Sequence, residues 1–243
     1  MSENAPLVNR SSDKMSVTDI FVKILQPCLA ELFGMAFFVF IGTTSMASGD
    51  LLIAGVAHGL GIGIAISSLG AISGGHLNPA VTIGVAIAGG ISPGLAAFYI
   101  ISQLLGSMLG AAMCRGVLNY TSAILAADNT SQTVYEQILG GTTNLGEHVE
   151  VGTGTLAEII TTTLLVTVVL MTAVDTRGKS QAAPMYIGLA VLVGILATGN
   201  VTGGSMNSAR SFGPCVVYSD VDSGVWDDHW VYWVGPLVGG AIA

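Results

Sequence analysis

One short motif occurs twice in this sequence, at positions 74 and 203, which are 129 residues apart. The first copy, GGHLNPAVTIG at 74–84, and the second, GGSMNSARSFG at 203–213, share Gly-Gly, Asn, Ala and the closing Gly in register. The second copy places Arg210 in an apolar stretch, and a cationic side chain in such surroundings predicts a functional site. We therefore expect two related halves, one at about 24–118 and one at about 155–243.

The composition is that of a membrane protein, with 51% hydrophobic and only 9% charged residues. Crossing a bilayer takes roughly 20 helical residues. The windows long enough to do so are 27–47, 51–72, 94–114, 155–174 and 182–199. A sixth runs from 229 to 243, where we expect a helix that is cut short. The first window is too long for a signal peptide and lacks a small-residue cleavage site, so it should remain as the first helix.

The basic residues predict the orientation of the chain in the membrane. Five of the seven lie in the N-terminal tail, 1–23, or in the link between the fourth and fifth windows, and positively charged segments stay on the cytoplasmic side; they are Arg10, Lys14, Lys23, Arg177 and Lys179. We expect a multi-pass protein with a cytoplasmic N-terminus and a disordered tail up to residue 22. The sequence does not distinguish the plasma membrane from a vacuolar or other internal membrane. Glycosylation sequons at Asn119 and Asn129 fall on the predicted outer side.

The sequence offers little for bond-breaking chemistry. Its three cysteines lie in apolar windows without CxxC spacing, which indicates buried structural thiols. There is no Gly-rich phosphate loop, HExxH helix or GxSxG elbow. We expect no enzyme activity, no metal site and no cofactor, and the net charge of −8 gives no reason to expect nucleic-acid binding.

The first and fourth windows each carry a single acid, Glu31 and Glu158. A carboxylate so far inside an apolar helix must face the protein interior and find hydrogen-bond donors. Free backbone N–H groups of the two Gly-rich loops are such donors, so we expect both carboxylates to support these loops. A proton relay is the alternative.

The segments that follow the two Gly-Gly pairs, 79–88 and 208–218, are apolar but too short to span a bilayer. Pro79 stands at the position favoured for the first residue of a helix, and Ser208 holds the equivalent place. We expect two re-entrant half-helices, and irregular backbone at this depth is tolerated only in protein or beside a water-filled cavity. Three spans and one re-entrant segment per half reverse the chain, so the halves should insert with opposite topology.

The N-termini of the two half-helices should then meet near the bilayer centre. Each carries about +0.5 elementary charge. Each also ends in an asparagine, Asn78 or Asn207, whose amide can donate to a passing acceptor. Two positive ends facing a narrow pore favour water oxygens and disfavour cations, including hydrated protons. The sequence thus predicts a narrow pore that favours water over cations.

Together these residues resemble the aquaporins, or major intrinsic proteins, over residues 24–243. Within that family His58, SGGH at 73–76 and HWVYWVGP at 229–236 look most like the tonoplast intrinsic proteins and the animal aquaporin-8 branch. The resemblance implies an all-α fold of six transmembrane helices and two half-helices, one pore per subunit and a homotetramer in the lipid bilayer. It also makes His76 a residue that supports the first loop. One departure is Ser208, where the family normally has Pro.

The family resemblance also implies a narrow ring, or selectivity filter, formed by His58, Ile195, Gly204 and Arg210. Strictly water-selective members of the family usually have an aromatic residue, a His and a Cys at the first three of these positions. Ile195 and Gly204 should widen the ring and remove a polar group, while the His58 imidazole stays available to a solute. We expect ammonia to pass beside water. We expect the donors of Arg210 to point at the pore, with the side chain held by carbonyls of the second loop; a structural arginine paired with a glutamate is the alternative.

Two other functions remain open at this point. A glycerol channel is disfavoured because Ser211 follows Arg210 where glycerol channels usually have Asp, and because Tyr232 and Trp233 fill a site that they usually keep smaller. A non-conducting structural or junctional membrane protein is suggested only by Ser208.

Overall fold

The computed structural model describes residues 15–121 and 131–243. In these two ranges the chain is helical and contains no β-strand. Arg10 and Lys14, which contribute to the predicted orientation, and the sequon at Asn129 lie outside the described residues.

The helical segments follow one another in an order that repeats. They are α1 (Val17–Ile20), η1 (Phe21–Leu25), α2 (Gln26–Ser45), η2 (Met46–Ser48), α3 (Leu51–Ser73), α4 (Pro79–Ile87), α5 (Pro93–Leu118), α7 (Val134–Gln137), η3 (Leu139–Gly141), α8 (Val151–Val169), η4 (Leu170–Val174), α9 (Ala183–Thr202), α10 (Ser208–Tyr218), η5 (Ser223–Trp226) and α11 (Val231–Ile242). Long, long, short, long describes both α2 to α5 and α8 to α11, except that α11 has 12 residues.

Five stretches within the described ranges are long and apolar enough to cross a membrane. They are Val17–Ser48, Leu51–Ser73, Pro93–Leu118, Val151–Val174 and Ala183–Thr202. These stretches contain the five windows predicted from hydropathy, apart from Ala182, which is the N-cap of α9. At about 1.5 Å per residue the 12 residues of α11 span about 18 Å.

The first helix begins earlier than the hydropathy predicts. The expectation of a disordered tail up to residue 22 is wrong from Val17 onward, because Ser16 caps a helix there by accepting a hydrogen bond from the backbone N–H of Asp19. Lys23 also pairs with Asp19 one turn away, at 2.6 Å. These polar contacts extend the helix beyond its apolar part, and a hydropathy window does not detect them.

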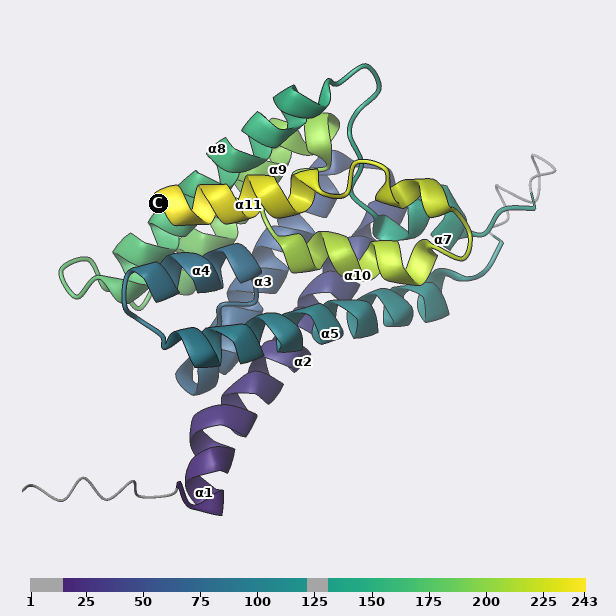
Figure 1. Ribbon diagram of the computed structural model, residues 1–243. Helices are drawn as coiled ribbons and strands as arrows, with labels where there is room; N and C mark the ends of the chain where they lie inside the picture. The colour runs from purple at the N-terminus through teal and green to yellow at the C-terminus, as the bar shows by residue number, and fades with distance from the viewer. Residues whose placement is uncertain (1–14, 122–130) are drawn as a thin grey trace, which may run out of the picture.

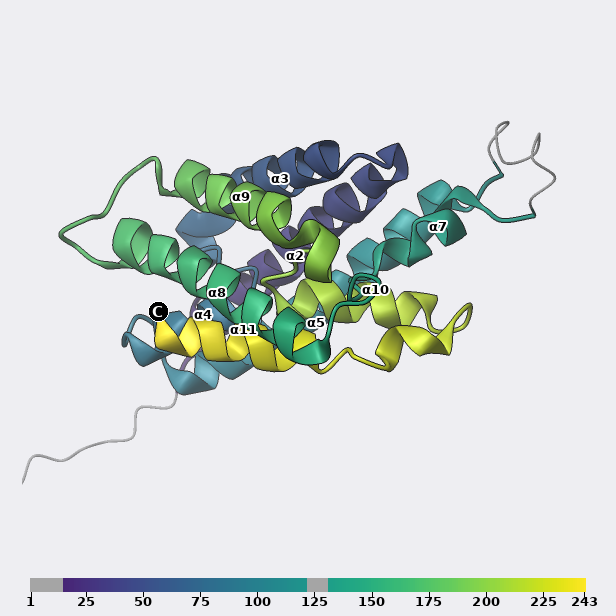
Figure 2. The same ribbon diagram turned by 90° about the horizontal axis from the view of Figure 1, so that it is seen from above.

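The packing pairs relate the two halves. In the first half α2 packs on α3 and α5, and in the second α8 packs on α9 and α11, while α3 and α9 join the halves. Each half-helix packs on a long helix of the opposite half: α10 lies on α5, and α4 lies on α11. Figures 1 and 2 show the two half-helices entering from opposite ends of the bundle, α4 on the side of the α8–α9 link and α10 on the side of α7. The halves are therefore interlocked through their half-helices.

Large apolar side chains cover much of the outside of the bundle. Exposed examples from four different helices are Phe37, Leu60, Leu105 and Ile160. On a water-soluble protein so many exposed apolar side chains would be unusual. In a bilayer they are the expected contact surface for lipid or for neighbouring subunits.

Candidate pore and its constriction

Asn78 and Asn207 tie the N-termini of the two half-helices together. The Nδ2 amide of Asn78 donates to the carbonyl of Met206, and the Nδ2 amide of Asn207 donates to the carbonyl of Leu77, each at 2.8 Å. The two bonds are related by the internal repeat, since each asparagine reaches the residue that precedes the other. The side-chain oxygens are used as well, because each asparagine is the N-cap of its own half-helix.

Leu77 and Met206 hold the loops in an unusual backbone conformation. Their φ angles are +48° and +53°, in the left-handed region that non-glycine residues rarely adopt. Such a conformation costs of the order of 1–3 kcal/mol per residue and is retained where the surroundings enforce it. Here it directs each carbonyl toward the asparagine of the opposite half.

Glu31 provides the support for the first loop. Its buried carboxylate accepts hydrogen bonds from the backbone N–H groups of His76 at 2.9 Å and Leu77 at 2.7 Å. Ser73 Oγ and Gln103 Nε2 donate to the same carboxylate at 2.7 and 2.8 Å. Four donors to a carboxylate that is 0% exposed compensate for its burial.

Glu158 does the same for the second loop. It accepts from the backbone N–H groups of Ser205 at 2.9 Å and Met206 at 2.7 Å, and from Thr202 Oγ1 at 2.6 Å. Glu31 and Glu158 are both 0% exposed. The strained residues before the asparagines, Leu77 and Met206, are thus each bound through their N–H to a buried carboxylate.

Replacing Glu158 with alanine is expected to lower the stability of the folded protein by several kcal/mol. The change leaves two backbone N–H groups and one hydroxyl without a partner, at about 1–3 kcal/mol each. Thermal unfolding in detergent measures the loss. Glu158→Gln, which keeps an acceptor oxygen, should lie between the parent and the alanine variant. An alanine variant with the melting temperature and water flux of the parent would contradict this support.

A second pair of polar contacts repeats behind each asparagine. His76 Nδ1 lies 3.2 Å from Thr82 Oγ1, and at the equivalent positions Ser205 Oγ lies 2.6 Å from Ser211 Oγ. Thr143, from the link between the halves, donates to Ser211 at 2.7 Å. Sequence reasoning passed over Thr82 and Ser211 in this role, although the 129-residue offset relates them.

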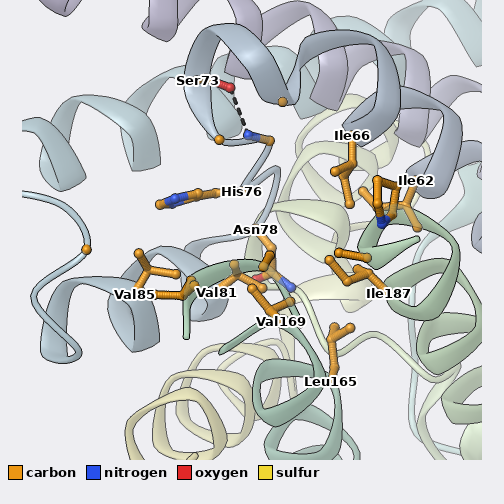
Figure 3. A pocket seen from close by; sticks show the side chains of 18 of the residues that line it. Ile62, Ile66, Ser73, His76, Asn78, Val81, Val85, Leu165, Val169 and Ile187 are labelled. Atoms are coloured by element: carbon orange, nitrogen blue, oxygen red, sulfur yellow. Dashed lines mark hydrogen bonds between the residues drawn. The ribbon is translucent and has the colours of Figure 1, made fainter. Parts of the chain in front are cut away.

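A cavity of about 940 Å³ leads from the two asparagines to the link between α8 and α9. Asn78 and Asn207 line its inner end, and Lys179 and Ser180 line it at the link. Figure 3 shows His76 and Asn78 among apolar side chains of the cavity, including those of Val81, Val85, Leu165, Val169 and Ile187. This lining leaves few polar groups beside a solute except at the loops.

The link at this mouth forms a compact turn. The Asp175 carboxylate hydrogen-bonds the Arg177 guanidinium and the Arg177 backbone N–H, which lowers its pKa from 3.8 to about 2. The Asp175 carboxylate therefore stays ionised to lower pH than a free aspartate does.

The four residues of the predicted ring lie outside the lining of this cavity and are nearly buried. Ile195 and Gly204 touch, since a methyl group on Gly204 would lie 2.8 Å from the Cα of Ile195. Gly204 also has a φ of +62°, so a side chain there would be strained as well as crowded.

His58 differs from the expectation that its ring is available to a solute. Nδ1 lies 2.8 Å from the carbonyl of Ala54, one turn back on the same helix, and Nε2 is buried without a partner among the described residues. The imidazole packs against Gly42 of α2. In this rotamer both nitrogens face protein: Nδ1 faces the carbonyl of Ala54, and the buried Nε2 faces Gly42.

Arg210 is 3% exposed and is held by residues that the sequence did not indicate. Nη1 donates to the carbonyl of Gly141 at 2.8 Å, and Nη2 lies 3.5 Å from Sδ of Met46. The expectation that carbonyls of the second loop hold this side chain is therefore wrong for Nη1, because η3 folds back over the loop and brings Gly141 closer. No carboxylate pairs with Arg210 in the described ranges. The Gly-Gly pair at 140–141 is the one sequence signal that could have indicated this contact.

Ser208 begins α10 as Pro79 begins α4. The asparagines before them have similar extended backbones, with φ and ψ of −154° and 105° for Asn207 and −165° and 124° for Asn78. Ser208 is buried, and its hydroxyl has no hydrogen-bond partner among the described residues. The departure from proline thus leaves the half-helix formed and adds an unpaired polar group.

Ser208→Pro is expected to raise the stability of the protein by about 0.5–1 kcal/mol, because proline restricts the unfolded chain and fits the first position of a helix. The change also removes a buried, unpaired hydroxyl. Comparing the thermal unfolding of Ser208→Pro with that of Ser208→Ala separates the two contributions, since alanine removes only the hydroxyl. A destabilised proline variant would show that the serine N–H or hydroxyl is used.

Comparison with known proteins agrees with this geometry. A family model described as major intrinsic protein matches residues 20–243. Aquaporin-8 of Notomys alexis is 42% identical over 224 residues, with 90% of this chain and 80% of that protein covered. Aquaporin TIP2-1 of Arabidopsis thaliana is 41% identical over 233 residues, with 90% and 84% covered.

A solved structure shares the fold. The X-ray structure of the aquaglyceroporin from Plasmodium falciparum matches with a TM-score of 0.75 over 90% of this chain and 93% of that one. At 22% identity the match shows the fold alone. The all-α membrane fold with two half-helices predicted from the sequence is confirmed, and so is the resemblance on which the site residues were assigned. The chain belongs to the major intrinsic protein family, the family of the aquaporins.

Proposed function

We propose that this protein is a passive channel for water that also passes neutral ammonia and excludes ions and protons. The observation that carries the proposal is the meeting of the two half-helix N-termini, joined through Asn78 and Asn207 at the inner end of a cavity. Membership of the family and the likeness to aquaporin-8 and the TIP aquaporins support a channel for water and small neutral solutes.

Exclusion of cations is supported by the charges around the proposed path. The N-termini of α4 and α10 each contribute about +0.5 elementary charge. Arg210 adds a full charge that forms no salt bridge with a carboxylate in the described ranges. A cation or hydrated proton that lost its water here would meet three positive groups, whereas the oxygen of a water molecule would be attracted to them.

Passage of ammonia is supported by the sparse polarity of the proposed ring. Ile195 contributes only carbon, Gly204 contributes no side chain, and the nitrogens of His58 face protein. Water cannot hydrogen-bond to such walls, and ammonia gives up its hydration at lower cost. The transported species is therefore neutral NH₃, since ammonium is repelled as other cations are.

Water and ammonia fluxes measured by stopped flow in the same proteoliposomes test this function. Both should exceed the fluxes of protein-free vesicles. Water flux equal to that of protein-free vesicles would favour a non-conducting structural protein. Glycerol flux as large as water flux would favour a glycerol facilitator, the other alternative.

The chain is an integral multi-pass membrane protein, and we extend this to a homotetramer with a cytoplasmic N-terminus. Helix α1 and the α8–α9 link lie toward the same end of the bundle, opposite α7 (Figure 1). Lys23 belongs to η1, which directly follows α1, and the link carries Arg177 and Lys179. Basic residues on one side indicate the cytoplasmic side. Cross-linking in native membranes and labelling of single cysteines in the link test the two statements separately.

A further inference from the structure

Gly42 lies against the His58 imidazole and leaves no room for a side chain. A methyl group on Gly42 would lie 2.7 Å from Cε1 of His58 and closer still to Cδ2 and Nε2. Gly42 is inside α2 and is not among the glycines of positive φ, so its backbone does not require glycine. Glycine inside a helix is less stable than alanine. The contact with His58 is the structural feature that accounts for the missing side chain.

The imidazole is confined on its other sides. Its Nδ1 lies 2.8 Å from the carbonyl of Ala54, and the ring of Phe38 stands edge-on to it with 5.7 Å between centroids. A ring expelled from the space at Gly42 would lose its present packing and would have to turn away from α2.

The same face of the first membrane helix also reaches Arg210. Met46 follows Gly42 by four residues, and residues four apart lie on one face of a helix. Its Sδ lies 3.5 Å from Nη2 of Arg210. This face of the helix therefore backs two of the four residues of the proposed ring, and Ile195 with Gly204 forms a separate, second pair.

We propose that Gly42 is a positioning residue that sets the width of the constriction. The space over its Cα receives the imidazole of His58 and keeps the ring out of the path of water and ammonia. A side chain at this position would push the ring toward Arg210 and Ile195, across that path. The inference rests on the proposed function, because it requires His58 to border the path.

Gly42→Ala tests the inference. Water and ammonia fluxes in proteoliposomes should both fall at least about tenfold, because a ring displaced into a path one molecule wide blocks every solute. A structure of the variant should show the imidazole moved away from α2.

Two further variants separate positioning from a general loss of packing. Gly61→Ala is the matched control, since a methyl group there would make only an ordinary contact of 3.5 Å with Ile41, and fluxes should stay at the parental level. Gly42→Ala combined with His58→Ala removes the displaced ring and should restore water flux to at least the parental value. The structure of Gly42→Ala then distinguishes a displaced imidazole from a wider spacing of α2 and α3, since truncating His58 relieves the clash in either case.

The outcomes distinguish this inference from the proposed function. Parental fluxes in Gly42→Ala, or reduced fluxes that His58→Ala does not restore, overturn the inference. An imidazole that stays in place in the variant structure also overturns it, whatever the fluxes. A parent protein that conducts no water, with a displaced ring in the variant, contradicts the channel function and still supports the placement of His58 by Gly42.

Discussion

Replacing Arg210 with alanine is expected to increase proton leak at least about tenfold and to admit larger solutes. A unit charge about 4 Å from another contributes about 4 kcal/mol at an effective dielectric constant near 20. Since 1.4 kcal/mol corresponds to a factor of ten, losing that charge alone accounts for the expected change. Removing the guanidinium also opens the space between Gly141 and Met46, which it now bridges.

Proton flux and solute cut-off in proteoliposomes measure this effect. Arg115→Ala is the matched control, because this arginine bonds Asp220 and the carbonyl of Val217 near the surface and should not alter selectivity. Arg210→Lys keeps a charge but cannot hold both Gly141 and Met46 with one planar group, so it should retain most of the proton exclusion and lose the solute cut-off. Unchanged proton leak and unchanged cut-off in the alanine variant would contradict the role of Arg210.

Exchanging the polarity of the ring is expected to abolish ammonia flux. In the double variant His58→Phe with Ile195→His, a phenyl side chain faces an imidazole. The four-residue constriction becomes narrower and gains hydrogen-bonding groups where Ile195 now offers only carbon. Water can exchange its hydration for such groups, so its flux should stay within about threefold of the parent. Ammonia loses the low-polarity wall on which its passage depends.

Paired water and ammonia measurements on the double variant and on both single variants make the test specific. Ile195→His alone should reduce ammonia flux more than water flux, because it adds the polar group. His58→Phe alone tests whether the side chain at position 58 of the constriction affects ammonia flux. Ammonia flux equal to that of the parent in the double variant would contradict the selectivity proposal while leaving the channel proposal in place.

Much of the fold was predictable because membrane constraints are visible in single residues. A helix in lipid must be apolar along its length, so hydropathy located the five long helices, four of them within a few residues of their observed bounds. Pro79 and the Gly-Gly pairs marked the half-helices, and α10 has the predicted bounds. The error at Val17 arose because capping by Ser16 is a local polar effect.

The roles of residues outside the motifs were less predictable. Glu31 and Glu158 stood out because an acid inside an apolar helix must find donors, and the loops offer them. Gly141 did not stand out, because the Gly-Gly pair at 140–141 does not say what its carbonyl contacts, and the position of that carbonyl depends on how the chain between α7 and α8 folds back. Gly42 was one glycine among many until the imidazole of His58 was found against it.

The sequence by itself determined the class of protein, its internal repeat and the residues that converge on the loops, because burying Asn, Glu or Arg in a membrane is costly and each such residue marks a site. The tertiary structure decided how those residues are held. It showed that each asparagine bonds to the opposite loop, that Gly141 and Met46 fix Arg210, and that both nitrogens of His58 face protein. These contacts join positions far apart in the chain through distances of a few ångströms, and only the packing of the two halves sets such distances.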